Sequence, residues 1–198
     1  MTKNEKDEKQ EDLIFPFIKG ERIDLVAQNS KWIPLYCKWQ NNPRVRHYAR
    51  HAMPSNPEEM KRWFEPPSER SAKGGVFFTI YHKKDKRPIG TIGFFWINWL
   101  NRNGWIMGMI GEPEYWGKGL VGEAATLLIK YGFTELNFHK IYAGIYNPNI
   151  RSLRAAEKLG FREEVVLKDE LYVDGRYVDT HQFSIFKRDW VKMNKENV

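Results

Sequence analysis

The sequence predicts an α/β (α+β) domain with a mixed, mostly antiparallel sheet flanked by helices. Hydrophobic residues alternate with a period of two in VFFTIYH, IGTIGFFWI and WIMGMIG, which the polar turns KKDKRP and NRNG separate. This pattern is typical of three consecutive antiparallel strands. Apolar residues at helical spacing occur on both sides of this meander in the sequence. The expected order of elements is therefore β-α-α-β-β-β-α-β-α-β-β.

The elements before the meander are a strand and two helices. The run RIDLVAQ at 22–28 predicts the first strand. Ser30 is the expected N-cap of a helix whose apolar residues recur at helical spacing, Trp32, Leu35, Tyr36 and Trp39. Pro57 predicts the start of a second, short helix, because proline suits the first helical position and the acidic residues after it suit the positive end of the helix dipole. Pro66 and Pro67 mark the expected end of this helix.

After the meander, two helices alternate with single strands before a final hairpin. The first of these helices has an apolar stripe formed by Leu120, Ala124, Leu127, Leu128 and Tyr131. The run KIYAGIY at 140–146 predicts a strand, and a helix around 150–159 is expected to end at Gly160 as its C′ residue. Asp174-Gly175 is the strongest short hairpin signal in the chain, and the last two strands are expected to flank it.

Length and composition favour a single domain. The chain has 198 residues, 41% of them hydrophobic, so one core can be buried. The folded domain is expected at 13–190, with a disordered tail at 1–12, where apolar residues are almost absent, and a second tail at 191–198. The sequence has no apolar run of 18 residues and its first residues are charged, so we expect no membrane association and a cytoplasmic protein.

The charge and the cysteine content limit the classes of partner. The net charge of +7 suits nucleic acid, an anionic membrane or a small molecule with several phosphates, and its sign alone does not decide among them. The only cysteine is Cys37, which excludes an internal disulfide and a thiol cluster for zinc or iron. We expect Cys37 to pack in the core and the protein to hold no metal.

The stretch EYWGKGLVGEA at 114–124 lies between a strand-like run and a helix-like run. In this context the backbone N–H groups at the start of a helix can bind an anionic group. Gly117 and Gly119 permit unusual φ angles and a close approach of the backbone, and Lys118 adds a positive charge at the rim. The stretch predicts a phosphate site, although such a turn on its own is a weak signal.

Three separated motifs give a more specific resemblance. The runs PEYWGKGLVGEA, NPNIRSLRAAEKLGF and LYVDGRYVDTHQFSIFKRDW resemble the GNAT superfamily of acetyl-CoA-dependent N-acetyltransferases, within it most closely the branch of ribosomal-protein N-terminal alanine/serine acetyltransferases. The resemblance covers about residues 13–190. It implies a GNAT-like sheet splayed between its fourth and fifth strands, with the pantetheine arm of acetyl-CoA in the gap.

The resemblance also implies a set of cofactor-binding residues. The family pattern Gln/Arg-x-x-Gly-x-Gly/Ala places the pyrophosphate on 116–122, where Trp116 stands first, Gly119 matches and Val121 replaces a small residue. The family polarises the thioester carbonyl with a backbone N–H of the fourth strand, which falls near Met109 and Ile110. The complete expected set is Met109, Ile110, Trp116, Gly117, Lys118, Gly119, Leu120, Val121, Gly122, Asn149, Ser152 and Arg154.

Two catalytic positions depart from the family. Where many members carry a tyrosine that protonates the leaving thiolate, this chain has Ala156. The resemblance implies Ser152 as the hydrogen-bond donor instead, with Asn149 positioning the cofactor. The alternative is that Asn149 or Asn147 only caps the helix and that Ser152 lies in its first turn.

The general base is the second departure. Relatives often carry a glutamate early in the fourth strand, and the corresponding residue is Ile106. Glu112 and Glu114 are the nearest carboxylates in the sequence, and Glu112 is the candidate base. The alternative is that both are partners of a helix dipole or solvated charges.

Residues for the acceptor are expected in two regions. Tyr177, Asp179 and His181 share one face of the last strand, where the acidic side chain could hold a cationic substrate; a hydrogen-bonded Asp–His pair is the alternative. His47 and His51 lie between the first two expected helices, where the family forms part of its acceptor site, and a solvated basic loop is the alternative reading. Arg154 and Lys158 lie one turn apart and either reach cofactor phosphates or face water.

Three functions are compatible with these residues. The first is acetylation of a protein N-terminal α-amino group, as in a ribosomal protein, because an amine of pKa near 8 needs less help from a base than a lysine. The second is acetylation of a small polycation such as a polyamine or an aminoglycoside. The third is a cofactor-binding or nucleic-acid-binding module without turnover. Association with the ribosome and a homodimer are further expectations.

Overall fold

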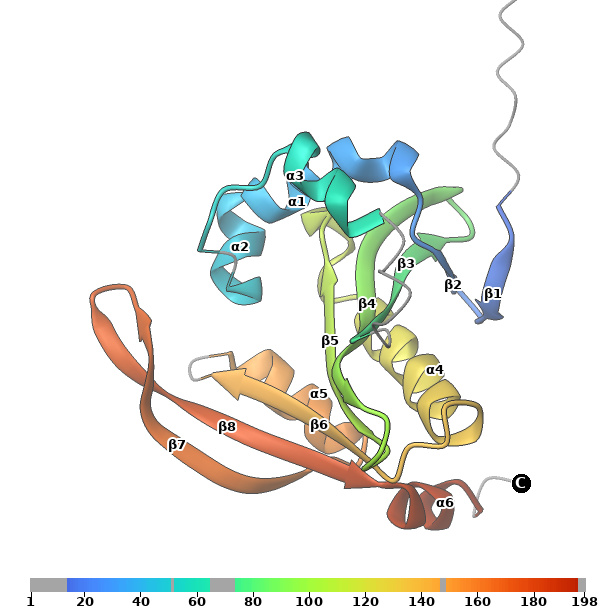
Figure 1. Ribbon diagram of the computed structural model, residues 1–198, viewed down its shortest axis with the longest axis vertical. Helices are drawn as coiled ribbons and strands as arrows, with labels where there is room; N and C mark the ends of the chain where they lie inside the picture. Colours follow the sequence, from blue (N-terminus) through green and yellow to red (C-terminus); the bar gives the residue numbers. More distant parts are fainter. Residues whose placement is uncertain (1–13, 51, 65–73, 147–148, 196–198) are drawn as a thin grey trace, which may run out of the picture.

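The computed structural model describes residues 14–50, 52–64, 74–146 and 149–195. They form one mixed sheet of eight strands in the order β1-β2-β3-β4-β5-β6-β8-β7 (Figure 1). The strands are β1 (Pro16–Lys19), β2 (Ile23–Ala27), β3 (Val76–His82), β4 (Arg87–Asn98), β5 (Asn103–Ile110), β6 (Lys140–Tyr146), β7 (Arg162–Val173) and β8 (Arg176–Phe186). The α-helices are α1 (Ile33–Asn41), α2 (Pro43–Ala49), α3 (Pro57–Lys61), α4 (Leu120–Thr134), α5 (Ile150–Lys158) and α6 (Lys187–Lys195). Short 3₁₀ turns lie at η1 (Ser30–Trp32), η2 (Arg62–Phe64) and η3 (Pro113–Tyr115).

The sheet is splayed between β5 and β6. All other neighbouring strands are antiparallel, whereas β5 and β6 run parallel and pair only where Asn103–Trp105 faces Lys140–Tyr142. Beyond this pairing the two strands diverge, and η3 and α2 lie toward the open end (Figure 1). The expected fold class and the gap between the fourth and fifth predicted strands are therefore confirmed.

Two hydrophobic clusters hold the helices on the sheet. The larger cluster joins strand residues such as Ile92 and Phe94 to α4 residues such as Leu128 and Phe133. The smaller cluster contains Ile33, Tyr36, Cys37, Trp39 and Met60 from α1 and α3, with Met109 of β5 packed against it. Cys37 is buried and free, as expected of a core residue. Successive strand residues point to opposite faces, so the two faces of β5 serve different clusters.

The predicted hairpin turn at Asp174-Gly175 and the predicted end of a helix at Gly160 are both confirmed. Asp174 and Gly175 have φ angles of 49° and 82°, the positive values that a type I′ hairpin turn needs. Gly160 has a φ of 87° directly after the C-cap of α5, as expected of a C′ glycine.

Three elements were not predicted. The strand β1 has only four residues, and α2 is a separate helix that begins at Pro43 after its N-cap Asn42. The helix α6 continues to Lys195, so the chain past Trp190 is helical where a tail was expected. The prediction of Ser30 as an N-cap is also wrong. The N-cap of η1 is Asn29, whose side chain accepts a hydrogen bond from the Lys31 amide. The expected tail at 1–12 and the end at Pro66–Pro67 lie outside the described residues.

Candidate functional site

The end of β5 presents one backbone group to the gap. The Gly111 amide donates to the Ile89 carbonyl on β4 at 2.8 Å. Because N–H and C=O groups alternate in direction along a strand, the Met109 amide also faces β4, whereas the N–H and C=O of Ile110 face the gap. The indole Nε1 of Trp116 donates to the Ile110 carbonyl at 2.8 Å. Of the two residues expected at this position, the geometry favours Ile110 as the donor to a ligand, while Met109 packs against α1.

The loop before α4 is shaped to accept an anion. Gly117 and Gly119 both have a φ of 75°, which strongly favours glycine. A Cβ placed on Gly117 or Gly122 would meet nothing within 4 Å, so the backbone is open to a ligand there. The helix α4 has 15 residues and no side-chain cap at its N-terminus, which leaves its first amides available. These residues fit a diphosphate group.

An arginine distant in sequence holds this loop. Arg22, at the start of β2, donates through its guanidinium to Glu123 Oε2 at 2.8 Å and to the Lys118 carbonyl at 2.9 Å. Its backbone amide also donates to Glu123 Oε1 at 2.8 Å. One guanidinium nitrogen lies 3.7 Å from the point that a Cβ on Gly119 would occupy. Sequence reasoning missed Arg22, because no local pattern connects it to a loop about a hundred residues away.

Lys118 and Val121 lie at the rim of the loop. The Lys118 ammonium is 5.1 Å from the centre of the Tyr115 ring, within the range of a cation–π contact. Val121 is exposed on the first turn of α4.

At the start of α5, Asn149 is the N-cap and its side chain accepts from the Ser152 amide at 3.3 Å. This is the capping geometry that the alternative reading described, and it also places the Ser152 hydroxyl on the first turn. Ala156 is buried, so no side-chain donor comes from the position of the family tyrosine. Arg154 is exposed on the same helix.

A cavity of about 440 Å³ lies where α2, the glycine loop and α5 meet. It is lined by Pro43, Arg44, His47, Tyr48, Trp116 and Arg151. The guanidinium of Arg44 lies 5.2 Å from the centre of the Trp116 ring, and the Tyr48 ring meets Trp116 edge to face. The structure therefore brings His47, expected from sequence, to the Trp116 loop, and adds Arg44, Tyr48 and Arg151. His51 lies outside the described residues.

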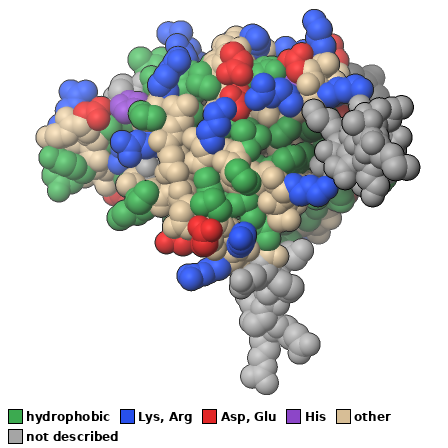
Figure 2. All heavy atoms as spheres, turned by 90° about the horizontal axis from the view of Figure 1, so that it is seen from above, with side chains coloured by type: hydrophobic (Ala, Val, Ile, Leu, Met, Phe, Trp, Pro, Cys, Tyr) green, Lys and Arg blue, Asp and Glu red, His purple; other side chains and the backbone are tan. Residues whose placement is uncertain are grey.

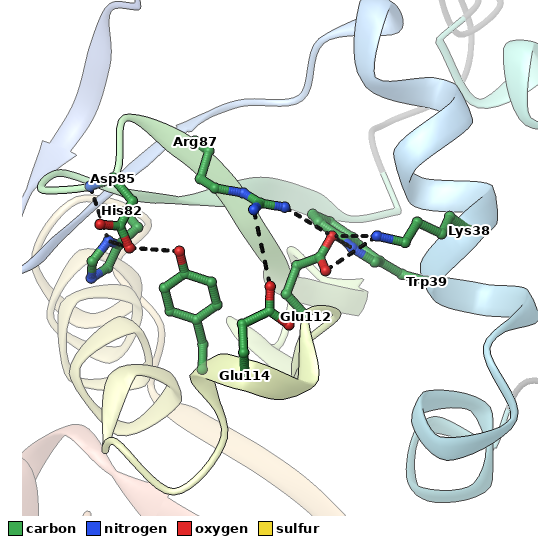
Figure 3. A network of polar contacts seen from close by, with 8 residues as sticks. Lys38, Trp39, His82, Asp85, Arg87, Glu112 and Glu114 are labelled. Atoms are coloured by element: carbon green, nitrogen blue, oxygen red, sulfur yellow. Dashed lines mark hydrogen bonds and ion pairs between the residues drawn. The ribbon is translucent and has the colours of Figure 1, made fainter.

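Glu112 lies in a polar network rather than in this cavity (Figure 3). Its buried carboxylate accepts from Trp39 Nε1 at 2.9 Å and from Lys38 Nζ at 3.0 Å, and Arg87 lies 3.3 Å away. Burial alone would raise the pKa of the Glu112 carboxyl, but the hydrogen bonds from Trp39 and Lys38 and the charges of Lys38 and Arg87 outweigh burial, and its pKa is lowered. A saturated carboxylate of low pKa is a poor base, so the geometry favours a structural role for Glu112.

The same network braces η3, from which the glycine loop starts (Figure 3). The Tyr115 hydroxyl donates to Asp85 Oδ2 at 2.6 Å. This hydrogen bond, together with burial, raises the pKa of Tyr115 to about 12. Glu114 is exposed and lies 4.0 Å from Arg87.

The residues expected on the last strand do not reach the cavity. Asp179 accepts from Lys168 Nζ at 2.7 Å and from the Asp169 amide at 3.1 Å. His181 pairs with Glu163 at 2.6 Å, so the expected Asp–His hydrogen bond is not the one that forms. Tyr177 is exposed and packs on Tyr172 at the hairpin.

Among the described residues, no helix is long and apolar enough to cross a membrane. The same residues contain no group of three or more His, Cys, Asp or Glu side chains that could hold a metal ion.

Replacing Glu112 with Gln should lower stability without acting on proton transfer. The lowered pKa means that ionised Glu112 stabilises the fold above its ordinary value of 4.5, and that this contribution is lost as the pH falls through its folded-state pKa. We expect Glu112→Gln to reduce the free energy of unfolding at neutral pH by about 1 to 3 kcal/mol, with the difference from wild type shrinking in acid. The exposed Glu114→Gln is the matched control, expected within about 0.5 kcal/mol. Equal stability of wild type and Glu112→Gln in urea denaturation at neutral pH would contradict this role.

The comparisons with known proteins agree with this geometry. The family model described as acetyltransferase (GNAT) domain matches residues 22–162. The chain is 30% identical over 171 residues to p20, an uncharacterized N-acetyltransferase of Bacillus licheniformis, covering 86% of this chain and 96% of that protein. It is 30% identical over 155 residues to the spermidine N(1)-acetyltransferase of Escherichia coli K12, covering 73% and 83%. The solved spermidine N-acetyltransferase of Vibrio cholerae in complex with CoA and spermine shares the fold, with a TM-score of 0.77 and 24% identity over 86% of this chain and 98% of that chain. The chain belongs to the GNAT family of acetyltransferases and is an N-acetyltransferase.

Proposed function

We propose that this N-acetyltransferase uses acetyl-CoA to acetylate a primary amine of a small polyamine. The use of acetyl-CoA is inferred from the gap beside β5. The Ile110 amide lies on the wall of this gap, and the open glycine loop lies at its end. The acceptor is inferred from relatives that are named for spermidine. They support a small amine better than the protein N-terminus of the ribosomal branch, which was our first expectation.

The proposed roles follow from the direction and charge of each group. The amides at 117–122 and the partly exposed Arg22 guanidinium hold the diphosphate. The Ile110 N–H donates to the thioester carbonyl, on which negative charge develops during attack. Ser152 donates a hydrogen bond to the leaving sulfur. Bound acetyl-CoA supplies the activated acetyl group.

A protein α-amino group is the second candidate, because the cavity lining is cationic. Arg44 and Arg151 both line it, and they would repel a polycation more than a single amine. Lys and Arg side chains are also spread over the face seen in Figure 2. The polyamine proposal requires these two arginines to serve the phosphates of the cofactor rather than the acceptor.

The direct test of the acceptor is thiol release from acetyl-CoA with three sets of amines. We expect release with spermidine and spermine, and none with peptides that carry free Ser or Ala N-termini. Release with the peptides alone would replace the polyamine by the second candidate. Thiol release with aminoglycosides alone would support the acetyltransferase reaction but replace the polyamine by an aminoglycoside as the acceptor.

Arg22→Gln should weaken cofactor binding with little effect on turnover at saturation. The change removes a charge beside Gly119 and the hydrogen bond to the Lys118 carbonyl. We expect calorimetry to show a Kd for acetyl-CoA raised about tenfold, equivalent to roughly 1.4 kcal/mol. Lys83→Gln is the matched control, because Lys83 bonds the Gly20 carbonyl beside β2 and does not touch the loop. Equal affinities of wild type and Arg22→Gln would remove Arg22 from the phosphate site.

Ser152→Ala should act on the chemical step. The backbone hydrogen bond from Ser152 to Asn149 survives the change, so the helix cap is retained. We expect turnover to fall by about a hundredfold with unchanged affinity for acetyl-CoA. Ser30→Ala, at the exposed turn η1, is the control for the loss of a hydroxyl. A wild-type rate in Ser152→Ala would restrict Ser152 to the first turn of the helix.

A further inference from the structure

The acceptor amine must lose a proton before it can attack, and the described residues offer few groups to take it. Amines such as those of polyamines are mainly protonated at neutral pH. Ile106 occupies the position where the family resemblance implies a glutamate. Glu112 is saturated by Trp39, Lys38 and Arg87 and does not line the cavity. Neither of these two positions therefore supplies a base to the cavity.

His47 of α2 is the imidazole that lines the cavity beside Trp116. Histidine is the side chain whose unperturbed titration lies nearest to neutral pH. The Tyr146 hydroxyl, at the end of β6, donates to the His47 carbonyl at 2.6 Å and fixes this turn of α2 over the gap. The His47 ring is about one-third exposed, so a substrate can reach it.

The neighbours of the ring leave one nitrogen for the substrate. Nδ1 of His47 faces Asp174 Oδ2, on the β7–β8 turn, at 3.9 Å. Nε2 is the second nitrogen of the ring, and with Nδ1 turned to Asp174 it is the one that we assign to the acceptor. The other titratable or charged side chains on the elements around the ring are Arg44 and Tyr48 on α2, Arg50 at the C-cap of α2, Arg151 on α5 and Tyr146 on β6.

Arg50 connects α2 to the hairpin on the same side. Its guanidinium donates to the Tyr172 carbonyl at 2.9 Å and lies over the Tyr146 ring at 5.5 Å. Together with the Tyr146–His47 bond, these contacts attach α2 both to β6 and to the hairpin that carries Asp174. His47 is therefore held in place from two elements that flank the gap.

We propose that His47 Nε2 is the proton acceptor for the substrate amine, an inference that rests on the proposed acetyltransferase reaction. Nε2 takes one proton from the ammonium, and the freed electron pair of nitrogen forms the new C–N bond to the acetyl carbon. The C–S bond breaks with its electron pair on sulfur. The second proton of the reacting nitrogen passes to the thiolate, with Ser152 as the donor at sulfur. The products are the acetylated amine, CoA and a protonated His47.

The test is the pH dependence of kcat/KM for the amine in His47→Gln. Glutamine keeps a polar side chain on α2, and the carbonyl bonded by Tyr146 is unchanged because it belongs to the backbone. We expect kcat/KM near neutral pH to fall about a hundredfold. We also expect the loss of the lower inflection of the wild-type pH profile, while the inflection set by the acceptor amine remains at higher pH. His139→Gln is the matched control, since His139 is exposed and lies outside the cavity.

Two further readouts separate this role from the alternatives. The Kd for acetyl-CoA and the circular dichroism of His47→Gln should equal those of wild type, and His47→Ala should show the same loss. If the variant raises KM for the amine but keeps the lower inflection of the wild-type pH profile, His47 only binds substrate and the proposal is wrong. A wild-type kcat/KM in His47→Gln would equally overturn it, with the acetyltransferase reaction left intact. Absence of turnover in wild type with every amine would instead overturn the proposed function, and this proposal with it.

Discussion

The loss of hydrogen bonding between β5 and β6 beyond Trp105 is the constraint on which the site depends. Where two strands separate, backbone groups that would have paired need other partners. The Ile110 carbonyl finds one in the Trp116 indole, which leaves the Ile110 amide as the group that faces the gap. Because the indole belongs to the first residue of the glycine loop, the same bond fixes the distance between the proposed phosphate site and the wall of the gap. The loop and the strand thus form one unit.

Two sets of contacts keep this unit in place. Arg22 and Glu123 bind the far side of the loop to β2, and the network of Glu112, Arg87 and Tyr115 holds η3 against β4 and α1. Both sets place charged groups where they are paired before any ligand arrives. A site preorganised in this way loses little conformational entropy on binding. The net charge of +7 alone did not distinguish among partners. Part of this positive charge, on Arg22, Arg44 and Arg151, lies around the glycine loop.

Local patterns in the sequence predicted the parts of the structure that local physics determines. The meander, the glycine loop before α4 and the Asp174-Gly175 turn depend on neighbouring residues, and all three were predicted. The roles of side chains depend on partners about a hundred residues away, as in Arg22 with Glu123 and Tyr146 with His47. For this reason the sequence could offer Glu112 only as a candidate base, whereas the structure shows its carboxylate bonded by Trp39 and Lys38. The short β1 strand and α2 were missed because neither has a long hydrophobic period.

Backbone amide shifts during titration with acetyl-CoA and with CoA give the most direct test of the central claim, that the acyl group meets the Ile110 amide while the glycine loop holds the phosphates. The account predicts that both ligands shift the amides of 117–122 alike, because both carry the diphosphate. It predicts that the Ile110 amide shifts strongly with acetyl-CoA and much less with CoA. Shifts confined to another surface, or an Ile110 amide that does not distinguish the two ligands, would contradict the account.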